Sequence, residues 1–382
     1  MQFPIEEFRR NATPFYYYDM ELLNHTLQVI RKYSDTPGYC VHYAVKANAN
    51  EPILRAISRQ GLGADTVSGA EISRALECGF APDKIVFAGV GKTDSEIRLA
   101  LNAGIGCLNV ESAEELDVIE QIAAEVGKAA PVAIRVNPEI DAHTHHYITT
   151  GIAENKFGVA MSRLDDMVRH IAESEHLHFK GLHFHIGSQI TTMAPYEELC
   201  RRILKLQEHL DEMSVTVPAI NVGGGLGIDY DDPDACPVTD FKAYFDTFRR
   251  HLPLRTGQQL HFELGRAIVA QCGTLVSSVL YVKQGVEKKF VIIDAGMTDL
   301  IRPALYQAHH KIDNITSTAK ETSVYDVVGP ICESSDIFAT DERLPVTRRG
   351  DLIAIRSAGA YGQAMASTYN CRPLAPALYS DK

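Results

Sequence analysis

The sequence predicts an α/β protein, in which a (β/α)8 TIM-type barrel is followed by a C-terminal β domain that the N-terminal strand joins. Three observations predict this fold class. Between about residues 40 and 265, eight short apolar runs alternate with segments of helical spacing. Eight strands alternating with helices are the number that closes a (β/α)8 barrel. Beyond residue 265, β-branched runs with glycine turns replace the long amphipathic helices.

The elements follow in chain order. The stretch 12–18 (ATPFYYY) is strand-like and is expected to join the β domain, and a helix over 20–33 begins after Asp19. The eight barrel strands are expected at 41–47, 63–68, 84–89, 106–111, 131–137, 180–187, 219–224 and 259–264. Helical spacing is clearest over 113–127 and 194–213. Capping-box patterns mark three helix starts, at Ser68 with Glu71, Thr93 with Glu96, and Ser112 with Glu115.

The β domain rests on four β-branched segments, at 266–283, 289–294, 324–328 and 351–357. We therefore expect a barrel domain over 20–265 and a β domain formed by 1–19 and 266–382. An open doubly wound sheet would also alternate strands with helices. It is disfavoured because no GxGxxG fingerprint follows the first strand.

Composition limits the classes of function. The 382 residues are 45% apolar and 23% charged, as in an ordinary soluble globular protein. The net charge of −12, with no Lys/Arg block, argues against nucleic acid or an anionic membrane as a partner. The start MQFPIEEFRR resembles no secretory signal, and no run of 18 apolar residues predicts a transmembrane helix. We expect a cytoplasmic protein whose eight scattered cysteines are reduced.

Active-site groups of a (β/α)8 barrel lie at the C-terminal ends of its strands. This rule selects Lys46, Asp65, His185 and Glu263, which follow or end the first, second, sixth and eighth predicted strands. It also selects the glycine run 223–227 after the seventh strand. A lysine at a strand end is often a surface residue with a buried stem, but at a barrel mouth it can form a Schiff base.

The glycine run, Glu263 and the histidines each have a structural explanation as well as a functional one. Glycines at a strand end can simply form a tight turn, whereas bare amides before a helix can bind a phosphate. Glu263 can form an ion pair with Arg266 or bind a cofactor's ring nitrogen. The pair His183 and His185, and the cluster His143, His145 and His146, suggest a metal, but neither has a third ligand at suitable spacing, so we expect no metal site.

The expected β domain contains further polar groups in apolar or glycine-rich settings. Cys332 and Glu333 lie in a polar turn (GPICESSD), where the thiol can be inert and the carboxylate merely exposed. Arg302 and Tyr306 (LIRPALY) and Tyr361 (SAGAYGQ) are isolated polar groups. None of these residues identifies a chemistry by itself.

Taken together, the motifs are specific. They are YAVKAN (43–48), GADTVSGAE (63–71), HFHIGSQ (183–189), NVGGGLGIDY (221–230), ELGR (263–266), LIRPALY (300–306), CESSD (332–336) and SAGAYG (357–362). In this order they resemble the diaminopimelate decarboxylase family, pyridoxal-phosphate enzymes of the alanine-racemase-like fold. The resemblance runs from about Thr13 to Pro373. It implies decarboxylation of meso-2,6-diaminopimelate to L-lysine and carbon dioxide, the last step of lysine biosynthesis, through an external aldimine and a quinonoid.

The resemblance also implies roles for single residues. Lys46 would bind pyridoxal 5'-phosphate covalently and Cys332 would donate a proton, so these two are the expected catalytic residues. The other cofactor-binding residues would be Asp65, His185, Ser188, Gly224, Gly225, Glu263, Gly265, Arg266 and Tyr361. The substrate-binding residues would be Arg266, Arg302, Tyr306, Glu333 and Tyr361. Cys332 and Glu333 would reach the other subunit's site, which implies a homodimer.

The chemistry of two residue types agrees with this reaction. A carboxylate such as Glu263 favours a protonated pyridine ring, the electron sink that decarboxylation needs, whereas the related racemases place an arginine there. Arg266 and Arg302 can bind the distal carboxylate of diaminopimelate, and Glu333 its ammonium. A substrate such as ornithine has no distal carboxylate and would leave the arginines unpaired, which can cost about 10⁴-fold in selectivity.

Two alternatives stay open. One is a related pyridoxal-phosphate decarboxylase of a polyamine precursor such as carboxynorspermidine, which HIGSQ and Arg302-Pro303 fit less well. The other is a non-catalytic pyridoxal-phosphate carrier, which would need neither a β domain nor a proton donor. The polar segment 143–158 is long enough to form a lid over the substrate.

Overall fold

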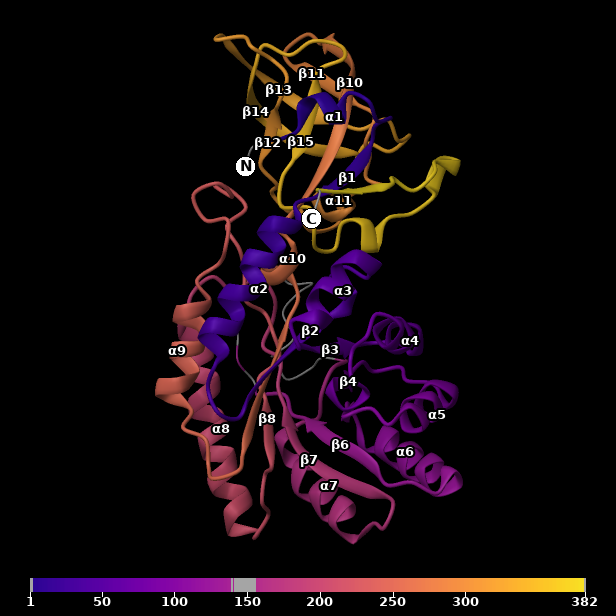
Figure 1. Cartoon of the computed structure of the whole chain (residues 1–382), viewed down its shortest axis with the longest axis vertical. Coiled ribbons are helices and arrows are strands. Elements are labelled where there is room, and N and C mark those ends of the chain that lie inside the picture. Colours follow the sequence, from indigo (N-terminus) through magenta and orange to yellow (C-terminus); the bar gives the residue numbers. More distant parts are fainter. Residues whose placement is uncertain (1–2, 139, 141–155, 381–382) are drawn as a thin grey trace. The chain divides into compact units, whose positions relative to one another are not determined.

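The computed structural model describes residues 3–138, 140 and 156–380. Strands β2 to β9 close into a parallel barrel, and the remaining strands form an eight-stranded sheet (Figure 1). The chain divides into two compact units. The barrel unit comprises 27–227 and 240–265, and the β unit comprises 1–26, 228–239 and 266–382. The closed barrel and the separate sheet confirm the predicted fold class.

Each predicted barrel strand is present. Neighbouring strands pair in parallel in chain order, and β2 pairs with β9 to close the barrel. Most of these strands are buried on both faces, which explains their nearly continuous apolar sequences. The bounds are β2 Tyr39–Ala44, β3 Gly63–Thr66, β4 Ile85–Phe87, β5 Cys107–Val110, β6 Ala130–Arg135, β7 Leu177–His183, β8 Ala219–Asn221 and β9 Gln259–Leu264.

Helices alternate with these strands. They are α3 Glu51–Arg59, α4 Gly69–Glu77, α5 Asp94–Ala103, α6 Ala113–Val126, α7 Met161–Glu173, α8 Ala194–Glu212 and α9 Phe241–His251. The predicted N-terminal helix is α2, Met20–Ser34, and the Asp19 carboxylate accepts a hydrogen bond from Leu22 N. Ser68, Thr93 and Ser112 all cap their helices, and Thr93 with Glu96 forms the reciprocal capping box.

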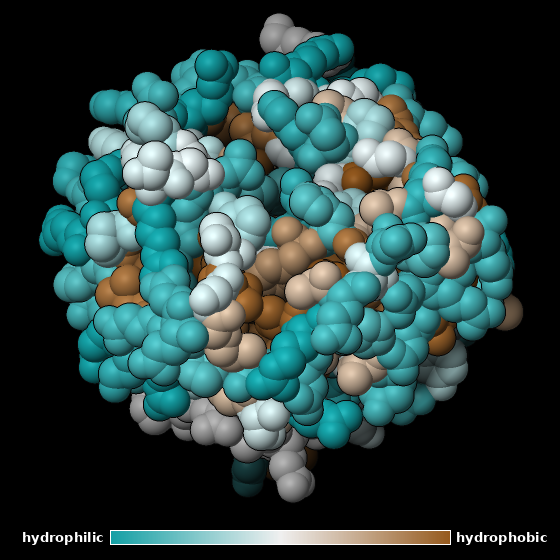
Figure 2. All heavy atoms as spheres, turned by 90° about the horizontal axis from the view of Figure 1, so that it is seen from below, coloured by the Kyte–Doolittle hydropathy of each residue, from teal (hydrophilic) through white to brown (hydrophobic). Residues whose placement is uncertain are grey.

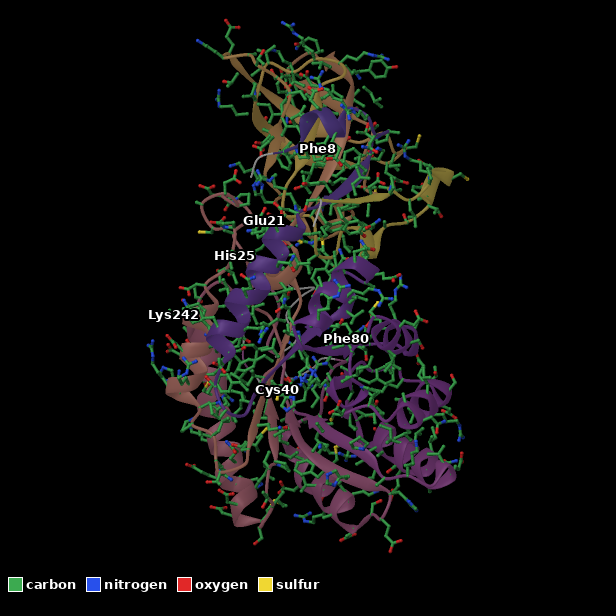
Figure 3. All side chains as sticks on the ribbon, in the orientation of Figure 1. Phe8, Glu21, His25, Cys40, Phe80 and Lys242 are labelled. Carbon is green, nitrogen blue, oxygen red and sulfur yellow. The ribbon has the colours of Figure 1, made fainter. Side chains whose placement is uncertain are left out.

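An aromatic cluster anchors α9 to the barrel. The rings of Tyr244, Phe245 and Phe248 lie 5.7, 5.0 and 5.2 Å from the Phe262 ring of β9. All four side chains are fully buried, and burying each aromatic ring contributes about 1.5–3 kcal/mol. The opposite face of the helix is polar, and Lys242 projects outward from it (Figure 3). This packing fixes β9, the last barrel strand, which carries Glu263.

The β unit has its own sheet, in the order β12-β15-β10-β11-β13-β14. The predicted N-terminal strand β1, Phe15–Tyr18, pairs antiparallel with β10 and parallel with β16. Phe8, on the short helix α1 (Ile5–Phe8), packs with Phe15 against this sheet (Figure 3). The other bounds are α10 Arg266–Val269, β10 Gly273–Gln284, β11 Lys289–Ile293, α11 Arg302–Tyr306, β12 Ile312–Asn314, β13 Thr322–Val328, β14 Ile337–Pro345, β15 Leu352–Ile355 and β16 Ala377–Tyr379.

Two details differ from the sequence interpretation. Strand β14 was not expected, because its sequence IFATDERLP is charged and largely exposed. The glycine run 223–227 does not open directly into a helix, since α9 begins only at Phe241. Its amides therefore belong to a loop.

Two further sequence features concern the segment after β6 and the length of the helices. The cluster His143, His145 and His146, and most of the expected lid, lie outside the described residues. In the described part of the chain, no helix is long and apolar enough to cross a membrane.

Candidate active site

Lys46 lies immediately after β2, in a short 3-10 helix, Val45–Ala47. Its Nζ is 3.8 Å from the Oδ2 of Asp65 at the end of β3, and the two side chains are 38% and 1% exposed. Burial raises the pKa of Asp65 well above its usual range, and nearby Glu263 raises it further, while Lys46 opposes both effects. The pair joins a partly exposed amine to a buried carboxyl group.

Glu263 lies on β9 inside the barrel, where three donors meet its carboxylate. Its Oε1 accepts hydrogen bonds from Asn109 Nδ2 at 3.2 Å and Asn221 Nδ2 at 2.7 Å. Its Oε2 is 2.9 Å from His183 Nε2. Burial raises the pKa of Glu263, but His183 and then Lys46 lower it more, so the net pKa lies below the usual range. The structure therefore holds a buried carboxylate in its ionised form.

The two histidines at the end of the sixth barrel strand, β7, and just after it have different environments. His183 ends β7 and is 1% exposed, with Nε2 on Glu263 and no hydrogen-bond partner at Nδ1 within the described residues. His185 is half-buried, and Gly187 N donates to its Nδ1 at 3.4 Å. Burial lowers the pKa of His185 well below its usual range, and Arg135 and Lys46 lower it further. His185 is therefore a neutral ring at pH 7.

The glycine run forms the loop after β8. Gly225 has a φ of +95°, and a Cβ there would lie 2.5 Å from the Gly187 carbonyl oxygen. A Cβ at Gly224 would collide with the Glu263 carbonyl oxygen. No described residue accepts a hydrogen bond from the amides of Gly224 or Gly225. Ser188 is half-buried in the loop after His185, and Gly265 links β9 to α10. The loop thus offers donors to an anion.

Two of the predicted arginines converge in the β unit. Arg266 begins α10 and Arg302 begins α11, and their side chains are 6% and 5% exposed. Both donate a hydrogen bond to the hydroxyl of Tyr230. The Arg266 guanidinium also lies 5.0 Å from the Tyr361 ring centre. Tyr306, at the end of α11, is half-buried.

Cys332 and Glu333 lie in the turn between β13 and β14, and both are exposed. Asp336 organises this turn by accepting hydrogen bonds from Ile331 N at 2.7 Å and Met297 N at 2.6 Å. Glu333 Oε1 accepts a hydrogen bond from Tyr369 at 2.7 Å. The turn therefore presents a thiol and a carboxylate to solvent. All eight cysteines of the chain are free thiols.

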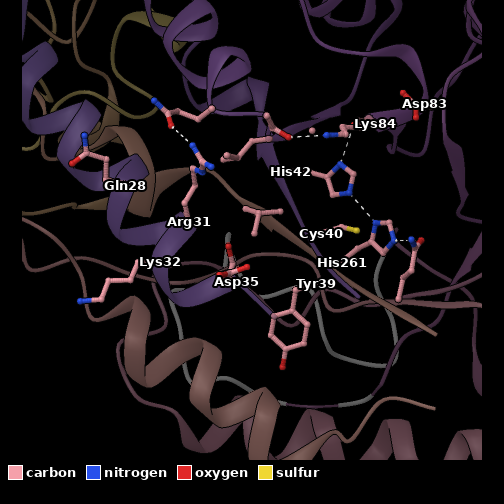
Figure 4. A pocket seen from close by; sticks show the side chains of 17 residues that line it. Gln28, Arg31, Lys32, Asp35, Tyr39, Cys40, His42, Asp83, Lys84 and His261 are labelled. Carbon is pink, nitrogen blue, oxygen red and sulfur yellow. Dashed lines mark hydrogen bonds between the residues drawn. The ribbon is translucent and has the colours of Figure 1, made fainter. Parts of the chain in front are cut away.

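A cavity of about 760 Å³ lies at the other end of the barrel, where the strands begin (Figure 4). His42 Nε2 and His261 Nδ1 are 2.8 Å apart on its wall. Two of its cations already have hydrogen-bond partners, since Arg31 bonds Gln60 and Lys84 bonds the Gly61 carbonyl. In Figure 2, which views the molecule from below, apolar residues gather near the centre of a mainly hydrophilic face. We assign no chemistry to this end.

The described residues contain no cluster of three or more His, Cys, Asp or Glu side chains that could hold a metal ion. Sequence reasoning noticed His183 but gave it no role, and it missed Asn109, Asn221, Tyr230 and His310. Their contacts join segments that lie 8 to 154 residues apart in the chain. His183 was visible as a histidine at the end of a strand, and Asn221 and Tyr230 begin and end the motif NVGGGLGIDY. Asn109 and His310 lie in none of the motifs.

Comparison with known proteins shows the family and the fold of the chain. The family model "Pyridoxal-dependent decarboxylase, pyridoxal binding domain" matches residues 23–270. A diaminopimelate decarboxylase of Bacteroides thetaiotaomicron is 57% identical over 381 residues, which covers 100% of this chain and 98% of the relative. The crystal structure of the Helicobacter pylori diaminopimelate decarboxylase with L-lysine is 42% identical, with a TM-score of 0.93, and the match covers 99% of this chain and 94% of that one.

A more distant relative has the same fold. The diaminopimelate decarboxylase of M. jannaschii, also solved with L-lysine, is 35% identical, with a TM-score of 0.90. The match covers 99% of this chain and 89% of that one.

Proposed function

The chain belongs to the family of pyridoxal-dependent decarboxylases, and from this premise we propose which of its residues perform the reaction. It is a pyridoxal-phosphate enzyme that decarboxylates meso-2,6-diaminopimelate to L-lysine and carbon dioxide. The observation that supports our assignment best is the ionised, buried Glu263, which lies in the same barrel unit as Lys46.

The barrel residues fit pyridoxal phosphate by their chemistry. Lys46 supplies the amine that holds the cofactor, and Glu263 supplies the anion that keeps a proton on its ring nitrogen. The amides of Gly224 and Gly225, which have no acceptor among the described residues, suit the phosphate, with Ser188, Gly265, Arg266 and Tyr361. The neutral His185 suits stacking on the cofactor ring. Asp65, 3.8 Å from Lys46 Nζ, suits holding the lysine amine that binds the cofactor. When bound, pyridoxal phosphate supplies the electron sink for the carbanion left by departing carbon dioxide.

The substrate's far end requires a second set of residues. Arg266 and Arg302 are buried cations that suit the distal carboxylate, and Tyr306 and Tyr361 add hydroxyl groups. Glu333 suits the distal ammonium. The Helicobacter pylori relative crystallised with L-lysine, which keeps that carboxylate and ammonium. We assign these five residues to substrate recognition.

Proton balance requires a donor at the reacting carbon. Decarboxylation breaks the bond from this carbon to the carboxylate, and a new C–H bond must form there before lysine leaves. We assign the proton to the Cys332 thiol, which regains a proton from solvent after each turnover. The Arg266 and Arg302 cations hold the other carboxylate in place, so that one end alone reacts.

We further propose a homodimer with shared active sites. Cys332 and Glu333 are exposed in the single chain, although a proton donor works best in a site from which water is excluded. A second copy of the chain would cover this turn, and Cys332 and Glu333 of the turn would complete the active site of that second copy. In this arrangement the barrel domain (20–265) binds the cofactor, and the β domain (1–19 and 266–382) contributes substrate-binding and proton-donor residues.

The reaction is tested with purified enzyme, pyridoxal phosphate and meso-diaminopimelate, by measuring carbon dioxide and lysine together. We expect equal amounts of both, and neither from Lys46→Ala. Lys242→Ala, which changes an exposed lysine of α9, serves as the matched control. A higher kcat/KM for carboxynorspermidine would contradict the substrate assignment.

The shared site is tested by mixing variants. Lys46→Ala and Cys332→Ala should each be inactive alone, while random re-association makes about half of the dimers mixed, each with one intact site. We expect about a quarter of the parental activity in the mixture. No recovery, with dimers confirmed by sedimentation, would overturn the sharing of Cys332.

A further inference from the structure

Two buried arginines of the β unit share one phenolic oxygen. Arg266 Nη1 and Arg302 Nη1 donate to Tyr230 Oη at 2.7 and 2.8 Å. The Arg302 guanidinium also lies 5.0 Å from the Tyr230 ring centre. Burial lowers the pKa of Arg302, and the neighbouring Arg266 lowers it further. Two cations held this closely favour the binding of an anion.

A histidine completes the support of Arg302. Arg302 Nη1 is 2.9 Å from His310 Nε2, and His310 Nδ1 is 2.9 Å from the Arg356 carbonyl oxygen. A guanidinium can only donate, so Nε2 accepts and Nδ1 carries the ring proton. Burial, followed by Arg302, lowers the pKa of His310 to about 3. The ring is therefore neutral at pH 7 and its tautomer is fixed.

These bonds use only one of the three guanidinium nitrogens. Nη1 has two hydrogens, one for Tyr230 and one for His310. Within the described ranges, no hydrogen bond or ion pair reaches Nη2 or Nε of Arg302. The Nε–H and one Nη2–H lie along the same edge of the planar group, and such an edge binds a carboxylate through two parallel hydrogen bonds.

We propose that Tyr230 and His310 are positioning residues that hold Arg302 by Nη1 and reserve its Nε–Nη2 edge for the substrate's distal carboxylate. The inference rests on the proposed function, which assigns Arg302 to that carboxylate. Neutral acceptors suit this task, because a supporting Asp or Glu would form an ion pair with Arg302 and compete with the substrate. Tyr230 also joins Arg302 to Arg266, so that the two cations act as one receptor.

Two probes separate this role from a general effect on the site. L-lysine keeps the distal carboxylate after decarboxylation, whereas cadaverine has no carboxylate. In the holoenzyme we expect Tyr230→Phe and His310→Phe to weaken inhibition by L-lysine about tenfold or more. The KM for diaminopimelate should rise by a similar factor, with a smaller change in kcat. Inhibition by cadaverine should change by less than about twofold, since it makes no use of the arginines.

Conservative and control variants sharpen the test. His310→Gln should restore most of the affinity for L-lysine, because its amide oxygen can accept from Arg302 and its amide nitrogen can donate to the Arg356 carbonyl. His309→Phe changes the neighbouring, half-exposed histidine, which faces Asp231. Tyr281→Phe changes a tyrosine that is 57% exposed. Both controls should match the parent enzyme.

Arg302→Gln separates the positioning role of Tyr230 and His310 from the substrate-binding role of Arg302. If it weakens L-lysine inhibition while Tyr230→Phe and His310→Phe do not, the positioning role is wrong and the proposed function stands. If Arg302→Gln has no effect on L-lysine, the role of Arg302 is wrong and the inference fails with it. Equal weakening of both inhibitors, with a lower unfolding temperature, would mean that Tyr230 and His310 only stabilise the fold.

Discussion

The buried ion pair of Arg135 with Glu111 gives a sharp prediction about charge inside the barrel. Arg135 Nη1 donates to Glu111 Oε1 at 2.8 Å, and the side chains are 7% and 3% exposed. Burial raises the pKa of Glu111, but Arg135, followed by His183 and Lys92, together lower it more, and the net pKa lies below the usual range. Arg135→Leu should therefore leave a buried carboxylate without its cation.

The size of the effect follows from what remains around Glu111. Gly158 N at 2.8 Å and Gly89 N at 3.2 Å still donate to its carboxylate. Breaking a buried pair costs about 3–5 kcal/mol. The carboxylate can instead bind a proton, which at pH 7 costs about 3.7 kcal/mol for a group of pKa about 4.3. Protonation limits the penalty, so we expect a loss of about 3–4 kcal/mol in the free energy of unfolding.

Urea unfolding at pH 7 and pH 5 measures this loss. The parent's Glu111 has a depressed pKa in the folded state, so its stabilising effect is present above the unfolded pKa and declines as pH falls. The gap between parent and Arg135→Leu should narrow at pH 5, and adding Glu111→Gln should recover part of the loss. Arg98→Leu, which breaks an exposed pair with Glu125, should change stability far less. Equal losses in Arg135→Leu and Arg98→Leu would refute the reasoning.

Three further predictions concern a helix cap, a titration and the cofactor. Thr93→Ala should lower the free energy of unfolding by about 1 kcal/mol, measured by urea, because it removes the oxygen that caps Glu96 N. Hydrogen bonds from Gly69 N and then Thr93 N lower the pKa of Glu96, so its stabilising effect is lost as pH falls below about 4.3. Unfolding between pH 7 and pH 3 should therefore show a shallower pH dependence for Glu96→Gln. Glu263→Gln should still bind pyridoxal phosphate, as absorbance will show, but turn over about 100-fold more slowly or worse.

The barrel could be predicted because its signal is local and repeated. Most strands are short apolar runs that are buried on both faces, and most helices show helical spacing, three of them with a capping residue, so no distant partner is needed to recognise them. β14 lacks such a signal, because its exposed charges hide the alternation and its pairing with β13 provides the order. The short helices α10 and α11 are likewise set by their surroundings, since four or five residues hold too few intrahelical bonds.

The candidate site was predictable only where residue type and strand end coincide. Lys46 and Glu263 meet both conditions, and the glycine run ends a strand even though no helix follows it. Asn109 and Asn221 do not, because an asparagine in a strand has no single chemical meaning. Their role appears only when the closed barrel directs both amides to one carboxylate oxygen.

Two buried carboxyl groups of the same barrel are driven to opposite pKa values by their surroundings. Glu263 receives hydrogen bonds from two amides and faces His183, so its charge is favoured despite burial. Asp65 has Lys46 at 3.8 Å and an Oδ1 without a hydrogen-bond partner among the described residues, so burial and the charge of Glu263 dominate. Like charges in one low-dielectric space cannot both ionise cheaply, and the donors decide which one does. The donors therefore assign the anion to Glu263, where the proposed function places a cationic ring, and leave Asp65 as the group that gains a proton first.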